Sequence, residues 1–199
     1  MTIVQRTLTV SLFLGLISPL WGESCNSKYV ISQQLSSVNF SIKKLFFDEQ
    51  GGFRDYSGAI CFDPSHPERS SVRIVVQATS IDTRVEMRDR ELRSDDFFDI
   101  ARYPILSFVS SSVNLKSSDL FEVTGDLTLH GVNRRITVPV HMLGARKMQG
   151  WGEFIGFGVE FVIDRTEFGV NGTRWSGDSV ILSKAVNIHL SIGAVRSEY

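Results

Sequence analysis

Hydrophobic and polar residues alternate with a period of two along much of this chain. The alternation is clearest in five segments, 72–77, 121–129, 136–142, 157–164 and 186–192. Weaker patterns of the same kind cover four more, 29–33, 37–43, 52–62 and 104–115. A period of two gives a β-strand one face for a core and one for water, so these segments predict strands.

Turn-forming sequences separate the segments. The run Asp63-Pro64-Ser65-His66-Pro67 must turn, and residues 116–119 and 130–133 have the composition of hairpin loops. About eight strands joined mainly by hairpins indicate an all-β barrel or sandwich. A barrel leaves no open edge, and at about eight strands it is wide enough to enclose one small ligand.

Residues 84–99 break the alternation, because they are highly charged and helix-prone. Within them, Ser94 before two aspartates has the character of a helix N-cap that opens a short second turn. We therefore expect a short helical insertion between two strands.

Strand order predicts where the connections gather. In an up-and-down meander, alternate connections lie at the same end of the barrel. The end that carries the helical insertion, here named the insertion end, should gather residues 43–51, 84–103, 130–133 and 164–180. The opposite end should gather residues 63–69, 116–119 and 144–152.

The N-terminus has the plan of a secretory signal peptide. Arg6 precedes an apolar run at 8–17 that is too short to span a bilayer, and the chain then becomes polar. We expect residues 1–22 to be cleaved, leaving a domain of residues 23–199 without a transmembrane segment. The alternative is that the apolar run is a buried strand or helix of the fold.

Export would place the two cysteines in an oxidising compartment. Cys25 and Cys61 are then candidates for one disulfide, which would tie the N-terminal tail to the edge of a strand. The alternative is a pair of unpaired thiols.

Charge and chemistry-bearing residues argue against several function classes. The formal net charge of −1 supplies no basic field to attract nucleic acid. The four histidines show no metal-ligand spacing, so neither a metal nor another cofactor is expected. Carboxylates such as Asp89, Glu91 and Asp164 interleave with arginines, which favours ion pairs and caps over acid–base catalysis.

Several segments resemble one known family in matching order. Residues 79–99 (TSIDTRVEMRDRELRSDDFFD) resemble its S-I-D-T…R-D-x-H-L-x-S-x-D-F-F-D signature, and residues 124–132 (TGDLTLHGV) resemble T-G-D-L-T-I-H-G-V. Residues 163–169 (IDRTEFG) are similar to I-N-R-S-D-F-G. From about residue 28 to 193, the chain resembles the YceI-like family of polyisoprenoid-binding, lipocalin-like periplasmic proteins. It departs from the signature at Glu91, where the family usually has His.

The resemblance implies an extended eight-stranded antiparallel lipocalin-like barrel that holds a long-chain isoprenoid-like or fatty amphiphile. The expected function is periplasmic binding, transport or storage of that amphiphile, without catalysis. Two alternatives remain: a lipid- or quinone-processing enzyme that uses charged residues at the barrel mouth, and a secreted interaction module with a filled interior. A homodimer is compatible with the sequence.

The inward phase of the strands supplies the candidate ligand-binding wall. It consists of Phe40, Ile42, Val72, Ile74, Val76, Phe108, Val123, Leu127, Ile136, Val138, Phe157, Val159, Phe161, Ile188 and Leu190. Four further aromatic residues are expected to close the insertion end: Phe97, Phe98, Phe168 and Trp175. Candidates to pair with a head group are Arg84, Arg88, Arg165 and Arg174. For Arg88 and Arg165 the favoured alternative is structural, namely pairing with Asp89 or Asp164 to lock the loops.

Overall fold

A computed structural model describes residues 25, 27–150, 152–172 and 182–197 of the protein. The strands are β1 (Lys28–Ile31), β2 (Ser37–Lys44), β3 (Phe47–Phe53), β4 (Tyr56–Cys61), β5 (Ser71–Gln77), β6 (Ile81–Asp82), β7 (Ile105–Leu115), β8 (Leu120–Leu129), β9 (Val132–Met148), β10 (Gly152–Asp164) and β11 (Leu182–Arg196). The helices are α1 (Glu86–Arg93) and four short 3-10 turns, η1 (Gln33–Leu35), η2 (Pro67–Arg69), η3 (Ala78–Ser80) and η4 (Arg165–Phe168).

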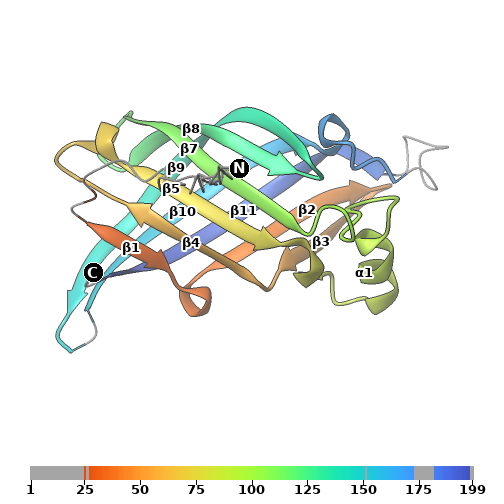
Figure 1. Ribbon diagram of the computed structural model, residues 1–199, viewed down its shortest axis with the longest axis horizontal. Coiled ribbons are helices and arrows are strands. Elements are labelled where there is room, and N and C mark those ends of the chain that lie inside the picture. Colours follow the sequence, from red (N-terminus) through yellow and green to blue (C-terminus); the bar gives the residue numbers. More distant parts are fainter. Residues whose placement is uncertain (1–24, 26, 151, 173–181, 198–199) are drawn as a thin grey trace, which may run out of the picture.

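These strands close into an antiparallel barrel with eight strand positions (Figure 1). Three positions are each made by two strands in succession: β1 with β2, β3 with β4, and β5 with β6. The long β11 closes the ring, because it pairs with β2 through Ile188↔Phe40 and with β1 through Tyr29↔Arg196. The prediction of an eight-stranded antiparallel barrel with a short helical insertion is confirmed.

The helix α1 and the turn between β2 and β3 lie at the right-hand end of the barrel in Figure 1, and the C-terminus lies at the left. The expected loop at 43–51 was wrong in extent, because β2 and β3 are joined by Leu45 and Phe46 alone. Lys44 and Phe47 already pair across the hairpin. The insertion end therefore carries a tight hairpin tip in place of a long loop.

Ser94 ends α1 and also opens the turn that follows it, as predicted. Its hydroxyl accepts from the N–H of Asp96 at 3.4 Å, and its carbonyl oxygen accepts from the N–H groups of Phe97 and Asp99 at 3.1 and 2.8 Å. Both its backbone N–H and its hydroxyl donate to the carbonyl oxygen of Glu91, at 3.0 and 2.7 Å. The start of the helix is fixed differently. The carboxylate of the buried Asp89 accepts hydrogen bonds from the N–H and hydroxyl of Thr83, at 2.8 and 2.6 Å.

A polar contact closes the barrel at the opposite end. The Tyr29 hydroxyl on β1 donates to Glu153 on β10 at 2.8 Å, and Arg196 on β11 donates to the same carboxylate at 2.7 Å. These three residues join three strands at the seam where the N-terminal strand meets the C-terminal one. We refer to them as the seam triad.

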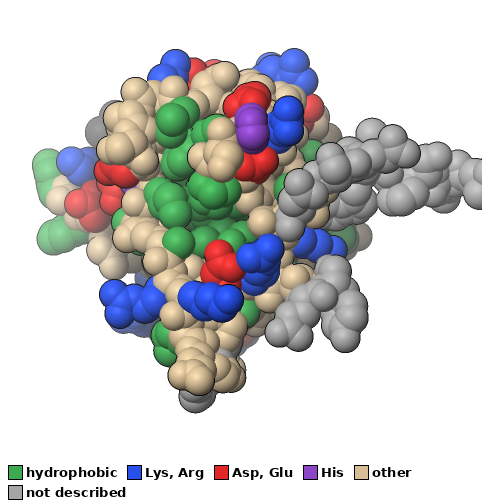
Figure 2. Space-filling view, turned by 90° about the vertical axis from the view of Figure 1, so that its left-hand side faces the viewer, with side chains coloured by type: hydrophobic (Ala, Val, Ile, Leu, Met, Phe, Trp, Pro, Cys, Tyr) green, Lys and Arg blue, Asp and Glu red, His purple; other side chains and the backbone are tan. Residues whose placement is uncertain are grey.

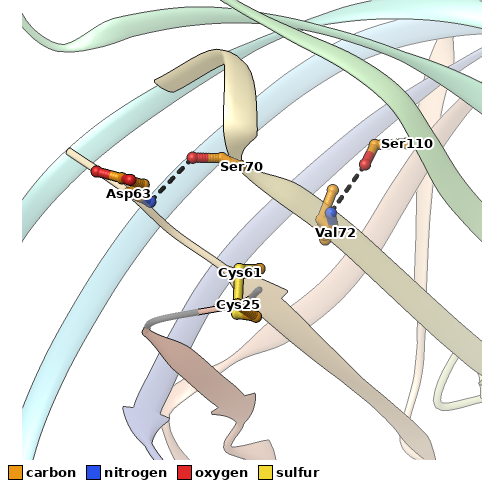
Figure 3. Close-up of a disulfide and its surroundings, with 6 residues drawn as sticks. All are labelled: Cys25, Cys61, Asp63, Ser70, Val72 and Ser110. Carbon is orange, nitrogen blue, oxygen red and sulfur yellow. Dashed lines mark hydrogen bonds between the residues drawn. A yellow bond between two sulfur atoms is a disulfide. The ribbon is translucent and has the colours of Figure 1, made fainter. Parts of the chain in front are cut away.

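A disulfide links Cys25 to Cys61, with a Cα–Cα distance of 5.6 Å (Figure 3). It ties the segment before β1 to the last residue of β4. Nearby hydrogen bonds fix the entry into β5. The N–H of Asp63 donates to the Ser70 hydroxyl at 3.0 Å, and the N–H of Val72 donates to the Ser110 hydroxyl at 2.8 Å.

Candidate functional site

The barrel interior is hollow and contains two adjoining cavities. The first, of about 200 Å³, is lined almost entirely by apolar side chains. The second, of about 160 Å³, lies toward the insertion end. Both are lined by the same six residues where they meet: Phe40, Phe53, Leu106, Leu129, Ile163 and Ile188. The cavities are therefore successive parts of one channel, and together they exceed the lower limit of about 300 Å³ typical of ligand sites.

Most of the residues expected to form the wall line the first cavity. They are Phe40, Val72, Ile74, Val76, Phe108, Val123, Leu127, Ile136, Val138, Phe157, Val159, Phe161, Ile188 and Leu190. Ile42, Phe97 and Phe98 line the second cavity instead.

Phe168 lies outside both linings. It is 2% exposed and packs with Phe97, Leu129 and Val170 in a separate apolar cluster. Phe97, Leu129 and Val170 all line the second cavity, so Phe168 supports the wall at the insertion end from behind and does not itself face the channel. Trp175 and Arg174 lie outside the described residues.

Sequence reasoning missed part of the wall on β3 and β4. Phe53, Ile60 and Phe62 line the first cavity, although 52–62 was expected to be one continuous strand. The chain breaks at Arg54 and Asp55, which shifts the period-two phase between Phe53 and Ile60. Phe121 was missed as well, although it is in phase with Val123 and the pattern could have identified it.

The polar residues that line the first cavity are uncharged, namely Asn39, Ser70, Ser71 and Ser107, and among the described residues charged side chains line only the second. Lys44, Glu49, Gln50, Thr83, Arg88, Glu91 and Arg165 contribute to its wall. The surface of the channel is therefore almost entirely apolar in both cavities, and charged side chains contribute to its wall only toward α1. This is the arrangement that suits an amphiphile with its polar group at the insertion end.

Arg88 is engaged by protein partners. Its guanidinium forms a salt bridge with Glu49 and donates to the Thr83 hydroxyl at 2.9 Å and the Thr83 carbonyl at 3.2 Å. The expected partner Asp89 instead accepts hydrogen bonds from Thr83. Arg88 thus joins β3 to the start of α1, a structural role with a different partner from the one predicted.

Arg165 is also engaged, although not by Asp164 as expected. It is 9% exposed and donates to the carbonyls of Val170, Asn171 and Ser183 at 2.7, 2.6 and 2.9 Å. Burial lowers the pKa of its guanidinium from the ordinary value. Asp164 accepts from the hydroxyl and N–H of Thr166, which lower the pKa of its carboxyl.

Arg84 is exposed and belongs to neither cavity lining. Its backbone N–H donates to Asp82 at 2.7 Å, in a left-handed conformation with φ of 62°. The two head-group candidates at the channel are therefore Arg88 and Arg165.

In the part of the chain that the structure describes, no three His, Cys, Asp or Glu side chains lie close enough together to hold a metal ion. His130 contacts two neighbouring residues. Its Nδ1 lies 3.2 Å from the carbonyl oxygen of Phe168, and its ring packs edge-to-face against Tyr103. Among the described residues, no helix is long and apolar enough to cross a membrane.

The opposite end of the barrel is apolar at its centre. Figure 2 shows hydrophobic side chains in the middle of this end, within a rim of charged and polar groups. Phe62 and Phe121 mark this limit of the first cavity, with their rings edge-to-face at 5.8 Å. No charged residue lines the first cavity in the described part of the chain.

Comparison with known proteins places this site in context. The family model of the YceI-like domain matches residues 29–194. A "UPF0312 protein" of Azotobacter vinelandii is 31% identical over 178 residues, which is 88% of this chain and 90% of the relative.

Two solved structures share the fold. BcnA of Burkholderia cenocepacia is 26% identical, with a TM-score of 0.77 over 83% of this chain and 99% of that one. A structure described as a polyisoprenoid binding domain from Saccharophagus degradans is 19% identical, with a TM-score of 0.65 over 85% of this chain and 98% of that one.

Proposed function

The chain belongs to the family of YceI-like domains, and from that premise we propose that it is an exported protein that binds a long isoprenoid-like or fatty amphiphile inside its barrel. Binding would serve the transport or storage of that amphiphile in the periplasm. The signal-peptide pattern of residues 1–22 supports export. The disulfide between Cys25 and Cys61 supports an oxidising compartment.

The observation that carries the proposal is a continuous channel with an apolar surface, to whose wall charged side chains contribute at one end only. Each methylene of a ligand tail buried there contributes about 0.8 kcal/mol. A tail of many carbons therefore binds without specific polar contacts, even after the cost of ordering it. The Saccharophagus degradans domain of the same fold, described as binding a polyisoprenoid, supports this ligand class.

The end with charged side chains sets the orientation and the head group. We place the tail against the wall of the first cavity and the head group beside Arg88 and Arg165 in the second. Arg88 is already neutralised by Glu49, and Arg165 is occupied by backbone carbonyls. An uncharged polar head group fits these surroundings better than a polyanion, which would need free guanidinium N–H groups.

The local engagement of Asp89 and Asp164 also favours binding over catalysis by these two carboxylates. Asp89 is buried and holds Thr83, and Asp164 caps η4 through Thr166. Neither carboxylate is placed as a general base toward the channel, since both are engaged in local hydrogen bonds.

Mass spectrometry of the purified protein tests the proposal. Native spectra should show a bound mass, and organic extraction should release an apolar compound. Val138→Trp, in a wall residue that is 6% exposed, should reduce the bound fraction by about tenfold or more, because the indole fills the channel. Val162→Trp is the matched control, because Val162 is 60% exposed. Equal loading of both folded variants, or a protein that carries and takes up no lipid, would overturn the proposal.

A further inference from the structure

Three consecutive apolar residues stand exposed where the β2–β3 hairpin turns. Leu45, Phe46 and Phe47 are 49%, 89% and 72% exposed. We call these three residues the hairpin tip. Large side chains on a soluble surface usually cover some of their area with neighbours, so an 89% exposed phenylalanine at an apex needs an explanation.

The backbone conformation of the hairpin tip is also unfavourable. Leu45 adopts a left-handed conformation with φ of 55° at the first position of a two-residue turn. Glycine or asparagine is the ordinary residue there, and a leucine is strained. The chain thus places an apolar side chain at a position where folding favours a small or polar one.

The tip lies at the insertion end, together with other exposed apolar groups. Val85 and Met87, at the start of α1, are 47% and 80% exposed. The β2–β3 turn and α1 lie at the same end of the barrel in Figure 1. Exposed apolar groups therefore gather at the end of the barrel where charged side chains contribute to the channel wall.

The same hairpin also forms the wall of the channel. Ile42 and Lys44 on β2 and Glu49 and Gln50 on β3 line the second cavity. Phe47 continues the inward-facing row of Phe53, Gly51 and Glu49 beyond the cavity, because alternate residues of a strand share a face. A surface that covers the hairpin tip therefore also lies at the end of the channel.

From this juxtaposition we infer that the hairpin tip inserts into the interface of a lipid membrane and presents the insertion end of the channel to it. Exposed aromatic rings partition into the membrane interface. Lys43 lies opposite Asp48 in the hairpin, and Lys44 lines the second cavity, so the tip presents an apolar surface with balanced charges beside it. That docking serves ligand exchange rests on the function proposed above.

A protein partner fits the tip less well. A stable protein interface buries about 800 Å² on each partner. Three side chains at a narrow turn supply less than that, since a phenylalanine buries only about 150–250 Å². A membrane needs no complementary shape, so a few exposed side chains suffice.

Co-sedimentation with vesicles tests the inference. The purified full chain should bind vesicles of phosphatidylethanolamine and phosphatidylglycerol. The double variant Phe46→Ser/Phe47→Ser should weaken this binding by about tenfold or more, because both rings leave the interface. Leu143→Ser/Val162→Ser is the matched control, since it removes two other residues that are 67% and 60% exposed.

The outcomes separate the two proposals. No vesicle binding by the unaltered protein, or an equal loss in both double variants, would overturn the membrane inference. A tip variant that keeps vesicle binding but loses self-association in native mass spectra would also overturn it, and would assign the tip to a second copy of the chain. Bound ligand mass in the same spectra reports on the channel, so ligand binding can stand or fail independently of docking.

Discussion

At the scale of single residues, Leu45 shows a conflict between local stability and exposure. A non-glycine residue in the left-handed region costs of order 1 kcal/mol or more. Leu45→Gly should relieve this strain and increase the free energy of unfolding by up to about 1 kcal/mol, offset in part by the greater freedom of glycine in the unfolded chain. Urea denaturation measures the change. A clear loss of stability would show that the Leu45 side chain packs in the fold despite its exposure.

Arg165 is the buried residue whose loss should be most costly. Arg165→Met preserves much of the side-chain volume but leaves the carbonyls of Val170, Asn171 and Ser183 without their donor. An unsatisfied buried group costs about 1–3 kcal/mol, so the free energy of unfolding should fall by about 2 kcal/mol or more. Chemical denaturation provides the measurement. If the variant is equally stable but loses bound ligand, Arg165 serves the head group and not the loop.

The seam triad belongs to the scale of elements, because it joins β1, β10 and β11. Hydrogen bonds from Arg196 and then Tyr29 hold the pKa of the Glu153 carboxyl below its usual value of 4.5. A lowered folded-state pKa means that the stabilisation is full above about pH 4.5 and is lost as the pH falls through the folded value. Glu153→Gln should therefore lower stability at neutral pH and flatten its decline in acid, as measured by urea midpoints at several pH values. An unchanged acid profile would show that other carboxylates govern acid unfolding.

Ionisation of Tyr29 should limit the stability of the same seam at alkaline pH. Burial, followed by the hydrogen bond to Glu153, raises the pKa of the phenol to about 12 from 10.0. A raised folded-state pKa means that this stabilisation is present below about pH 10 and is lost as the pH rises toward 12. Tyr29→Phe should remove this alkaline loss and cost about 1 kcal/mol at neutral pH. Absorbance of the phenolate during a pH titration, compared with Tyr29→Phe, identifies the group.

The disulfide anchors β1, whose pairing with β11 helps to close the barrel. Cys25 and Cys61 are 36 residues apart, and the bond restricts the unfolded chain across both strands of the first hairpin. Loops of this length give about 2–4 kcal/mol of stabilisation. Cys25→Ser/Cys61→Ser should lose an amount in this range, and reductant should then have no further effect on the urea midpoint. If the double variant is as stable as the oxidised protein, pairing of β1 with β4 and β11 suffices to hold the seam.

The strands could be predicted from the sequence wherever their hydrophobic alternation was a local feature of the segment. Period-two alternation identified the strands and the inward face of β8, β9 and β11, since each side chain reports its own face. The break around η1 was visible in the pattern, since 29–33 and 37–43 stand as separate segments. The break at Arg54 and Asp55 was not predictable, because the two strands that it separates remain within the barrel only through pairing with distant strands. The partner of Arg88 was missed for the same reason, because Glu49 lies 39 residues away and Asp89 is its neighbour in sequence.

For the molecule as a whole, the polar groups are distributed unevenly along the barrel axis. Charged side chains line the channel beside α1, and the lining of the first cavity that extends toward the opposite end is apolar. A symmetric channel would accept an apolar chain in either direction. This one favours a single orientation, since reversal would bury a polar head group in the first cavity, where Phe62, Phe121 and Phe157 contribute to the wall and no described residue is charged.

A hollow barrel should also depend on its ligand for part of its stability. A ligand that binds only the folded state adds about 2.7 kcal/mol when its free concentration is one hundred times its Kd. Protein stripped of lipid should therefore unfold at a lower temperature than protein as purified, and adding back the extracted lipid should restore the difference. In Val138→Trp the indole occupies the channel, so the stripped and unstripped proteins should unfold at the same temperature, whereas Val162→Trp should behave like the unaltered chain. Scanning calorimetry measures all three proteins. Equal unfolding temperatures for stripped and loaded unaltered protein would mean that the lipid does not occupy the barrel, because occupancy of the folded state alone must raise its stability.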